Sequence, residues 1–508
     1  MVSLANDAAE SCDVLIVGSG ALLSSLAAAL RKLGCSRLRA VAAASAPGPD
    51  GWAWSGSVRQ AQWVLLASGK PDMAELRALE AACRQAGKPL LPAVVHGGIG
   101  LAGPLIRPED ADGGCESGWR RLHLAARGAG SFPGTGSPGS GRSRGAAAPP
   151  PAEAAEAAAM LAHVAAAAWR TEAAEGGRSA LRDHLYLLDL DTAEGGFHPF
   201  QPHPASSGRR FVPRPLDAER LLEPGSGGAV AGDLPAVFDR LTSPVTGIFQ
   251  CWDEADLEQL PLCQCRVRPA DPLAEREDGW LPEIVCAGLT HLEARREAGL
   301  AGIEAYVARA AGAAELTEQP AEWAGIGAGG TAAEALNRAL TSALVRLHEE
   351  RTPPGRAVRI RLRSVGNIGD AHCRYYWQAL TIDRGPPLVG EGERCLGFPT
   401  VWVGVGGDWY GGVGLNRTLA FRSALQRAIL AAKPAECKVR PEPASGPEAP
   451  ALAVPEADGT DDAGLARSAL RTLRANRCRL FVFDLAAEPF LRDEWAGVLG
   501  VRLEEEGE

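Results

Sequence analysis

The chain has 508 residues, of which 46% are hydrophobic and 22% are charged. The length predicts about three domains. The composition is that of a folded globular protein and excludes a disordered chain. The net charge of −10 disfavours nucleic acid as a partner, because phosphate binding needs a basic face and no basic stripe occurs along the sequence.

The sequence predicts neither a membrane span nor a signal peptide. The best apolar run, Ala21–Leu30, is too short to cross a bilayer and contains Ser24 and Ser25. It is preceded by Asp7 and Glu10, where a secretory signal would carry positive charge. The 12 cysteines are scattered without a C-x-x-C pair, which is typical of reduced thiols and disfavours a structural metal site. We therefore expect a cytoplasmic protein with no bound metal and no membrane partner.

Alternating strands and helices are predicted for residues 1–127, the expected first domain. Short apolar runs typical of buried parallel strands occur at 13–17, 38–43, 63–67 and 89–95. Helices are expected at 21–33 and from Asp72 to Ala86, the second closed by Gly87. This alternation favours an α/β Rossmann-like domain with a doubly wound parallel sheet.

The rest of the chain is expected to contain a linker and a second domain. Residues 128–151 are rich in glycine, serine and proline and predict a linker. Residues 152–232, with a helix at 152–174 and a strand at 186–190, are expected to complete the first domain. Residues 233–508 predict an α+β domain with a Pro-rich insertion at 441–462.

Three Ala-rich patterns in the second domain predict helices, at 291–309, 325–347 and 411–429. Gly-rich turns are expected before the second and third helices, and strands are expected at 359–362, 375–382, 400–405 and 479–484. The segment 404–412 holds five glycines around Asp408 and Trp409. Two interpretations are equally favoured: a loop that grips a peptide or phosphate backbone, or a connection between a strand and a helix.

Gly18 and Gly20 follow the first strand, where a nucleotide-binding turn would lie. Position 23 is leucine where such a turn has its third glycine, and no acidic residue ends the second strand to hold a ribose. Nucleotide binding at Gly18 and Gly20 is therefore the less favoured interpretation, and a structural turn is the favoured one.

Glu293, Glu297 and Glu304 lie on one face of the helix predicted at 291–309, because they are spaced by four and seven residues. Carboxylates on one helix face can hold magnesium and a nucleotide phosphate. Arg295 and Arg296 lie among them, which favours an ordinary solvated face instead.

Two blocks of the chain resemble known families. The N-terminal block from VLIVGSGALLSSLAAAL, with GPLIRP at 103–108 as its most distinctive part, resembles the ThiF-like fold of azoline-forming peptide-maturation proteins. The block from about 241 to 433, with REAGLAGIEAY, GIGAGGTAAEALNRALTSALVR and VGLNRTLAFRSALQ, resembles a YcaO-type domain. The joined arrangement resembles the thiazole-containing bacteriocin maturation proteins.

The resemblance implies a function in making thiazole- and oxazole-modified ribosomal peptides. YcaO-type enzymes use ATP and Mg²⁺ to cyclodehydrate Cys, Ser or Thr side chains of a precursor peptide. When this sequence is aligned with the motifs of the YcaO-type enzymes, Glu304, Arg346 and Gln426 occupy retained positions of the nucleotide site. Other positions of that pattern that carry acids in active enzymes are replaced here by Ala301, Ser342, Val345 and Ser423. So few carboxylates would hold magnesium poorly.

Three functions remain open at this stage. The favoured one is a component of a maturation complex that binds the precursor peptide and presents it to other azole-forming enzymes, with degraded nucleotide sites and no assigned catalytic residue. The alternative is that the chain is itself the ATP-dependent cyclodehydratase, with a variant magnesium site built from Glu304, Asp370, Asp408 or Glu393. The third is an unrelated small-molecule function of the Rossmann-like domain.

Overall fold

The computed structural model divides the chain into two compact units. Unit 1 comprises Met1–Arg210, Ala236–Trp252 and Arg268–Pro282, and unit 2 comprises Phe211–Pro235, Asp253–Val267 and Glu283–Glu508. The residues that the structure describes are 12–42, 52–69, 72–96, 98–110, 114, 151–174, 177–201, 212–223, 233–273, 279–312, 323–353, 357–431, 440–443, 451–457, 461–494 and 497–505.

Two predictions about domain organisation stay predictions. The linker predicted at 128–151 lies, except for its last residue, outside the described residues. Residues 236–252 and 268–282 group with unit 1, whereas the sequence placed them in the second domain. The domain boundary predicted at 232 stays a prediction.

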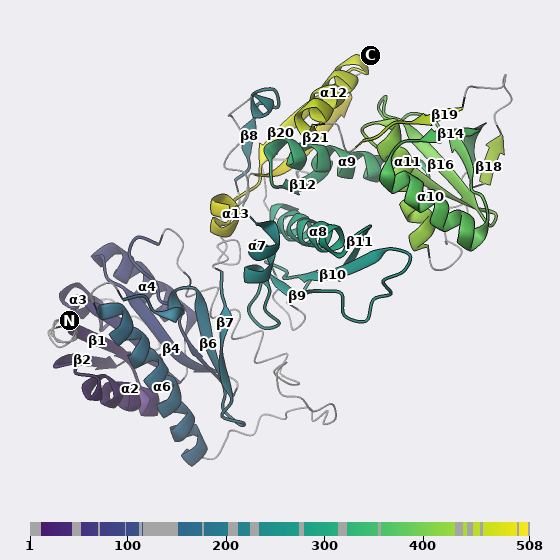
Figure 1. Ribbon diagram of the computed structural model, residues 1–508. Coiled ribbons are helices and arrows are strands. Elements are labelled where there is room, and N and C mark those ends of the chain that lie inside the picture. The colour runs from purple at the N-terminus through teal and green to yellow at the C-terminus, as the bar shows by residue number, and fades with distance from the viewer. Residues whose placement is uncertain are drawn as a thin grey trace. The chain divides into compact units, whose positions relative to one another are not determined.

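Unit 1 is built on one seven-stranded sheet, in the order β2-β1-β3-β4-β5-β6-β7 (Figure 1). Strands β1 to β4 pair in parallel, and β4 to β7 pair antiparallel. The predicted parallel α/β sheet is therefore confirmed, and antiparallel strands extend it on one side. The strands are β1 (Asp13–Gly18), β2 (Arg37–Ala42), β3 (Trp63–Ser68), β4 (Leu90–His96), β5 (Ile99–Ala102), β6 (His184–Asp189) and β7 (Gly195–Pro199).

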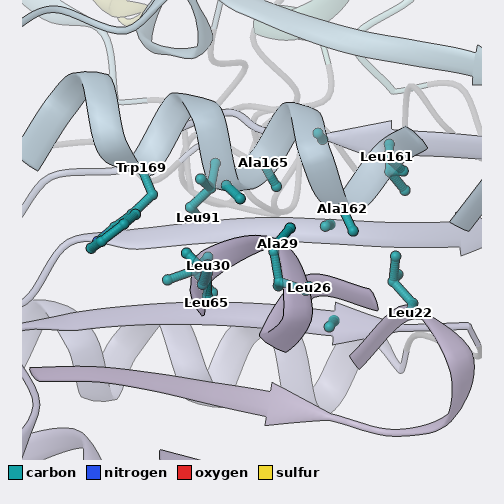
Figure 2. Close-up of a cluster of buried hydrophobic side chains, with 14 of the residues drawn as sticks. Leu22, Leu26, Ala29, Leu30, Leu65, Leu91, Leu161, Ala162, Ala165 and Trp169 are labelled. Atoms are coloured by element: carbon teal, nitrogen blue, oxygen red, sulfur yellow. The ribbon is translucent and has the colours of Figure 1, made fainter. Parts of the chain in front are cut away.

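Helices cover both faces of this sheet. Helices α2 (Gly20–Lys32) and α6 (Pro151–Ala173) pack on one face, and α3 (Ser55–Gln60) and α4 (Met73–Ala86) pack on the other. The α2 and α6 side bears a layer of fully buried leucines, alanines and Trp169 that lies over Leu65 and Leu91 of the sheet (Figure 2). Both faces are therefore apolar, which is why β1, β3 and β4 are almost continuous hydrophobic runs.

Unit 2 contains a four-stranded sheet, in the order β12-β21-β20-β8, and a five-stranded sheet, in the order β17-β16-β15-β13-β18. A short pair, β14-β19, and the antiparallel pair β10-β11 complete its strands. The bounds are β8 (Arg214–Leu216), β10 (Cys263–Pro269), β11 (Ile284–Gly288), β12 (Gly325–Gly329), β13 (Ala357–Arg363), β14 (Val365–Ile368), β15 (Leu388–Glu391), β16 (Thr400–Val405), β17 (Asp408–Val413), β18 (Arg440–Pro443), β19 (Leu452–Val454), β20 (Cys478–Asp484) and β21 (Gly497–Glu505).

The helices of unit 2 form two apolar cores with these sheets. Helices α9 and α12 pack on the four-stranded sheet, and α10 and α11 pack on the five-stranded sheet (Figure 1). The bounds are α8 (His291–Gly312), α9 (Ala332–Arg351), α10 (Ala371–Arg384), α11 (Arg417–Leu430), α12 (Asp462–Ala475) and α13 (Pro489–Glu494). Helix α7 (Leu234–Leu241), strand β9 (Phe249–Asp253) and strand β10 include residues of both units, and β9 joins β10 and β11 in one three-stranded sheet.

In the described part of the chain, none of the helices combines the length and the apolar character needed to cross a membrane.

The strand predicted at 375–382 is wrong, because these residues lie in helix α10. Their aromatic and β-branched side chains favour a strand by propensity. Helical packing prevails, since Cys373, Tyr376 and Leu380 recur at three- and four-residue spacing and are buried. The Asp370 side chain starts the helix by accepting a hydrogen bond from the Cys373 amide at 2.9 Å.

The Gly-rich segments predicted as turns before two helices are largely strands. Glycines alternate along β12, at positions 325, 327 and 329, so all three face α9. A Cβ on Gly327 would lie 2.3 Å from both the Ala335 oxygen and the Ala339 nitrogen. The missing side chains therefore let the backbone of α9 lie directly on the strand.

The segment 404–412 forms the hairpin between β16 and β17. Gly406 and Gly407 make the turn with φ of 61° and 92°, values that favour glycine. Trp409 is buried beyond it, and Gly412 lies against α11 as the β12 glycines lie against α9. The segment is therefore a connection between secondary-structure elements, as one of the two interpretations predicted. The glycine turn joins two strands, however, and not a strand to a helix.

Substituting Gly327 tests the close approach of α9 to β12. We expect Gly327→Ala to lower the free energy of unfolding by about 1–3 kcal/mol, because the methyl group would force the helix away from the strand. Gly464→Ala in α12 is the matched control, since its Cβ would meet no atom nearer than 3.4 Å. Urea unfolding of both variants checks this; equal stability losses would contradict it.

Candidate active site

The charged residues of α8 and α9 meet above strand β12. Arg338 of α9 points at two carboxylates of α8, with its Nε 2.6 Å from Glu304 Oε1 and its Nη1 2.6 Å from Glu297 Oε2. A third contact joins its Nη2 to Glu304 Oε2 at 3.2 Å. One guanidinium therefore bridges two of the three acids that the sequence placed on one helix face.

The backbone of β12 completes this arrangement. The Ala328 amide donates a hydrogen bond to Glu304 Oε1 at 3.0 Å, so that oxygen already has two donors. The Glu304 and Arg338 side chains are 20% and 22% exposed. Burial alone would lower the pKa of Arg338, but the charges of Glu304 and Glu297 and the hydrogen bonds to them outweigh it and raise the pKa above its usual value. Arg338 is therefore a permanent cation.

The other acids near this face have partners of their own. Glu334 pairs with Arg296 at 2.6 Å and accepts a hydrogen bond from the Gly330 amide at 2.9 Å. Glu293 accepts from the Leu289 amide at 2.8 Å, at the start of α8, and lies 3.4 Å from His372. Of the three predicted carboxylates, Glu293 therefore lies at the start of α8, whereas Glu297 and Glu304 belong to the ion-pair network. The three do not surround one common point.

A cavity of about 500 Å³ lies beside this network. Of the residues predicted to belong to a nucleotide site, Glu304 and Arg346 line it together with Ser342. Arg346 donates from Nη1 to the Trp323 oxygen at 2.9 Å and lies 3.4 Å from Glu350. The remaining lining comes from small residues of α8 and from the start of β12: Ala305, Ala308, Gly312, Trp323, Ala324, Gly325 and Ile326.

Gln426, the third predicted site residue, does not line this cavity. Its amide donates to the Ala287 oxygen of β11 at 3.1 Å, an ordinary side-chain contact between α11 and that strand. Cys286, the neighbour of Ala287, is close enough to the network for burial, with the charge of Glu297, to raise its thiol pKa to about 12. Gln426 therefore contacts β11 at the residue next to Cys286 and takes no direct part in the network.

The donor set does not fit a magnesium ion. Magnesium needs oxygen ligands in near-octahedral geometry, whereas the oxygens of Glu304 are bound by Arg338 and a backbone amide. Within the residues that the structure describes, no cluster of three or more His, Cys, Asp or Glu side chains is placed to hold a metal. A cation brought to Glu304 would also face the fixed charge of Arg338.

The acids proposed for a variant magnesium site lie elsewhere. Asp370 is fully buried and paired with Arg422 at 2.5 Å, and it caps α10. Burial would raise the pKa of Asp370, but the hydrogen bond and charge of Arg422 lower it below its usual value. Asp408 begins β17 and Glu393 lines a different cavity, so neither lines the cavity beside Glu304.

Gly18 and Gly20 serve the local packing of unit 1. A Cβ on Gly18 would lie 2.0 Å from the Ala67 oxygen, and that oxygen accepts a hydrogen bond from the Ser19 amide at 3.1 Å. Gly20 has a φ of 71°, which favours glycine, and begins α2. Both glycines are thus accounted for by the close contact between β1 and β3 and by the turn that follows.

Arg338 is the central residue of this network, and the sequence did not point to it. It lies one helical turn before Ser342, which stands where the YcaO pattern has an acid, so the two share a helix face. An arginine one turn from a position that carries an acid in the YcaO pattern is the signal that could have shown it. The contact itself depends on how α8 and α9 pack, which helical spacing does not reveal.

Structural comparison identifies the fold. The chain aligns over 98% of its length, and over 81% of the other chain, with a heterocyclase in complex with substrate and cofactor, at a TM-score of 0.63 and 13% identity. It aligns over 99% of its length, and over 80% of the other chain, with the heterocyclase TruD, at a TM-score of 0.56 and 14% identity. These values confirm the predicted resemblance at the level of the fold.

A weaker similarity covers a smaller share of the chain. E. coli MccB aligns over 39% of this chain and 64% of its own, with a TM-score of 0.26 and 12% identity, and at that score it supports no argument. The chain matches no known family profile and no curated protein sequence.

Removing Arg338 should turn the ion-pair network into a cation site. We expect Arg338→Ala to lower the free energy of unfolding by about 2 kcal/mol, because two carboxylates lose their partner. Millimolar Mn²⁺ or Mg²⁺ should restore much of that stability in the variant and leave the natural protein unchanged. Thermal unfolding and the Mn²⁺ electron paramagnetic resonance signal measure the two effects.

The matched control is the double variant Arg338→Ala/Glu304→Gln, which lacks one of the freed carboxylates. It should lose the response to Mn²⁺. Tight binding of Mn²⁺ by the natural protein would show that Arg338 does not block the site.

Proposed function

We propose that this protein takes part in the maturation of azole-modified ribosomal peptides by binding the precursor peptide and presenting it to other azole-forming enzymes. In this proposal the cavity of the nucleotide site is retained, but Arg338 occupies the carboxylates that would bind its metal ion. Glu304 and Arg346 are remnants of that site, and neither is assigned a catalytic function.

The first support is the extent of the fold. The similarity to two heterocyclases runs through nearly the whole chain and joins both compact units in one alignment. One of those heterocyclases was solved with its substrate and cofactor bound. Because function depends on the residues of a site and not on the fold, this similarity supports the architecture, and the choice between binding and catalysis depends on the side chains of the site.

The observation that carries the proposal is the guanidinium of Arg338 between Glu297 and Glu304. Cyclodehydration in YcaO-type enzymes activates an amide oxygen with ATP, and phosphoryl transfer relies on metal ions to neutralise the phosphates. Here the carboxylates that would recruit such an ion are neutralised by a side chain of the protein itself. The arrangement therefore favours binding over ATP-dependent chemistry.

The alternative is that the chain is itself the cyclodehydratase. Its support is the cavity of about 500 Å³, which is large enough for a small molecule and retains Glu304, Ser342 and Arg346 in its wall. For this function Arg338 would have to leave Glu304 when ATP and Mg²⁺ arrive. The two proposals therefore differ in one measurable property, which is binding of magnesium-ATP.

Calorimetric titration of the full chain separates the proposals. We expect no binding of magnesium-ATP at concentrations up to about 1 mM, because Arg338 and the Ala328 amide occupy the oxygens of Glu304, and binding of a candidate precursor peptide with a Kd on the order of micromolar. A scrambled peptide of the same composition is the control. Saturable binding of magnesium-ATP, with loss of water from the peptide detected by mass spectrometry, would instead establish the cyclodehydratase.

A further inference from the structure

Strand β7 is an open edge of the seven-stranded sheet of unit 1 (Figure 1). It pairs with β6 on one side, and among the residues that the structure describes no strand pairs with its other side. Gly195 and Phe197 are exposed, and 51% of Phe197 is accessible to solvent. An exposed edge strand offers its N–H and C=O groups to the backbone of another chain.

Hydrogen bonds at both ends of β7 show which of its backbone groups face β6. The Phe200 amide donates to the Asp183 oxygen at 2.9 Å, and the Asp189 amide donates to the Glu194 oxygen at 2.9 Å. In an antiparallel pair such bonds recur at every second residue. The even-numbered residues of β7 therefore bond to β6, and the N–H and C=O groups of its odd-numbered residues point outward.

Pro199 agrees with this assignment. Its outward oxygen accepts a hydrogen bond from the Thr246 hydroxyl at 2.7 Å. The outward N–H and C=O groups of Gly195 and Phe197 have no such partner among the residues that the structure describes. Two adjacent outward positions of β7 can therefore bond to a further strand.

The two edges of this sheet differ in charge. Strand β2, at the other edge, carries Arg37 and Arg39, and charged side chains on an edge strand disfavour pairing with another chain. Strand β7 has the sequence GGFHP and contains neither Lys nor Arg. Pro199, which has no N–H, ends the stretch that can pair. Strand β7 is therefore the edge that is open to another strand.

The open edge is complementary to itself. When two copies of β7 lie antiparallel about Gly196, Gly195 of each copy stands opposite Phe197 of the other. Both residues point their backbone groups outward, so each of these two pairs exchanges two hydrogen bonds. Glu194, which is exposed, stands opposite His198 of the second copy. This register places a carboxylate beside an imidazole and brings no two like charges together.

The side chains also fit this register. A Cβ on Gly195 would lie 2.3 Å from the Tyr186 hydroxyl, so this position has no room for a side chain of its own. Phe197 meets Tyr186 edge to face, with ring centres 5.1 Å apart at 65°. In the paired edge, the ring of Phe197 covers Gly195 of the second copy, an arrangement that stabilises glycines in edge strands. The exposed ring thereby loses contact with water.

We propose that this protein forms a two-fold symmetric dimer in which the β7 edges of two copies pair antiparallel and join their sheets. A two-fold contact uses the same surface on both copies, as this register requires. Because the strand is short, the dimer is weak, with a Kd on the order of 10 μM. The inference does not depend on the proposed function and uses none of the residues around the cavity beside Glu304.

Sedimentation velocity of the full chain tests this dimer. We expect the dimer fraction to rise between about 1 and 200 μM. Phe197→Lys should raise the Kd about tenfold or more, because it places two like charges at the paired edge. Ile382→Lys is the matched control, since Ile382 is an apolar residue of α10 that is 87% exposed and lies outside β7. It should dimerise as the natural protein does.

Gly196→Cys tests the register. In this register Gly196 stands opposite itself, and a Cβ there would lie 3.7 Å from the nearest atom, so a side chain fits. Glutathione disulfide should oxidise the two introduced thiols to an intermolecular disulfide, with release of reduced glutathione, and a non-reducing gel shows the product. Asp191→Cys is the control, because Asp191 is exposed but lies in the turn before β7, far from the two-fold axis. It should not form this cross-link.

Three results would overturn the proposal. The first is a natural chain that stays monomeric at about 200 μM, including one that instead binds an extended peptide at this edge. The second is Phe197→Lys dimerising as tightly as Ile382→Lys. The third is Gly196→Cys forming no more cross-linked dimer than Asp191→Cys.

Discussion

The ion pair that joins Arg338 to Glu297 and Glu304 is the interaction on which the rest of the site depends. It holds α8 and α9 together through charge and gives Glu304 a partner besides the Ala328 amide. A guanidinium at this position differs from a metal ion in that it cannot dissociate and carries no open coordination position. The same atoms that would otherwise recruit a cation therefore serve to stabilise the helix packing.

This ion pair depends in turn on how closely α9 lies on β12. The glycines of β12 remove every side chain between strand and helix, and a Cβ on Gly327 would also come within 2.9 Å of the Arg338 carbonyl carbon. The same device recurs where Gly412 of β17 lies against α11. Glycines that the sequence predicted as turns before helices thus form flat strand surfaces, and they set how closely the helices approach the strands.

Local patterns in the sequence predicted much of this fold. The apolar runs of β1, β3 and β4 and the Asp72 and Gly87 ends of α4 lie as expected, because period, capping and burial agree there. The segment at 375–382 was mispredicted because its propensity and its packing disagree. The ion pairs of Arg338 could not be predicted from the sequence, because they join residues that are 34 and 41 positions apart. Only the packing of two helices brings these residues together.

In the proposed function, the Arg338 side chain occupies the place where a nucleotide site would hold its metal. Crystals grown with ATP and Mn²⁺, measured at the manganese absorption edge, test it directly. We expect the Arg338 guanidinium to remain between Glu297 and Glu304, with no anomalous peak beside them. An anomalous peak on Glu304, with Arg338 displaced and nucleotide in the adjacent cavity, would contradict it.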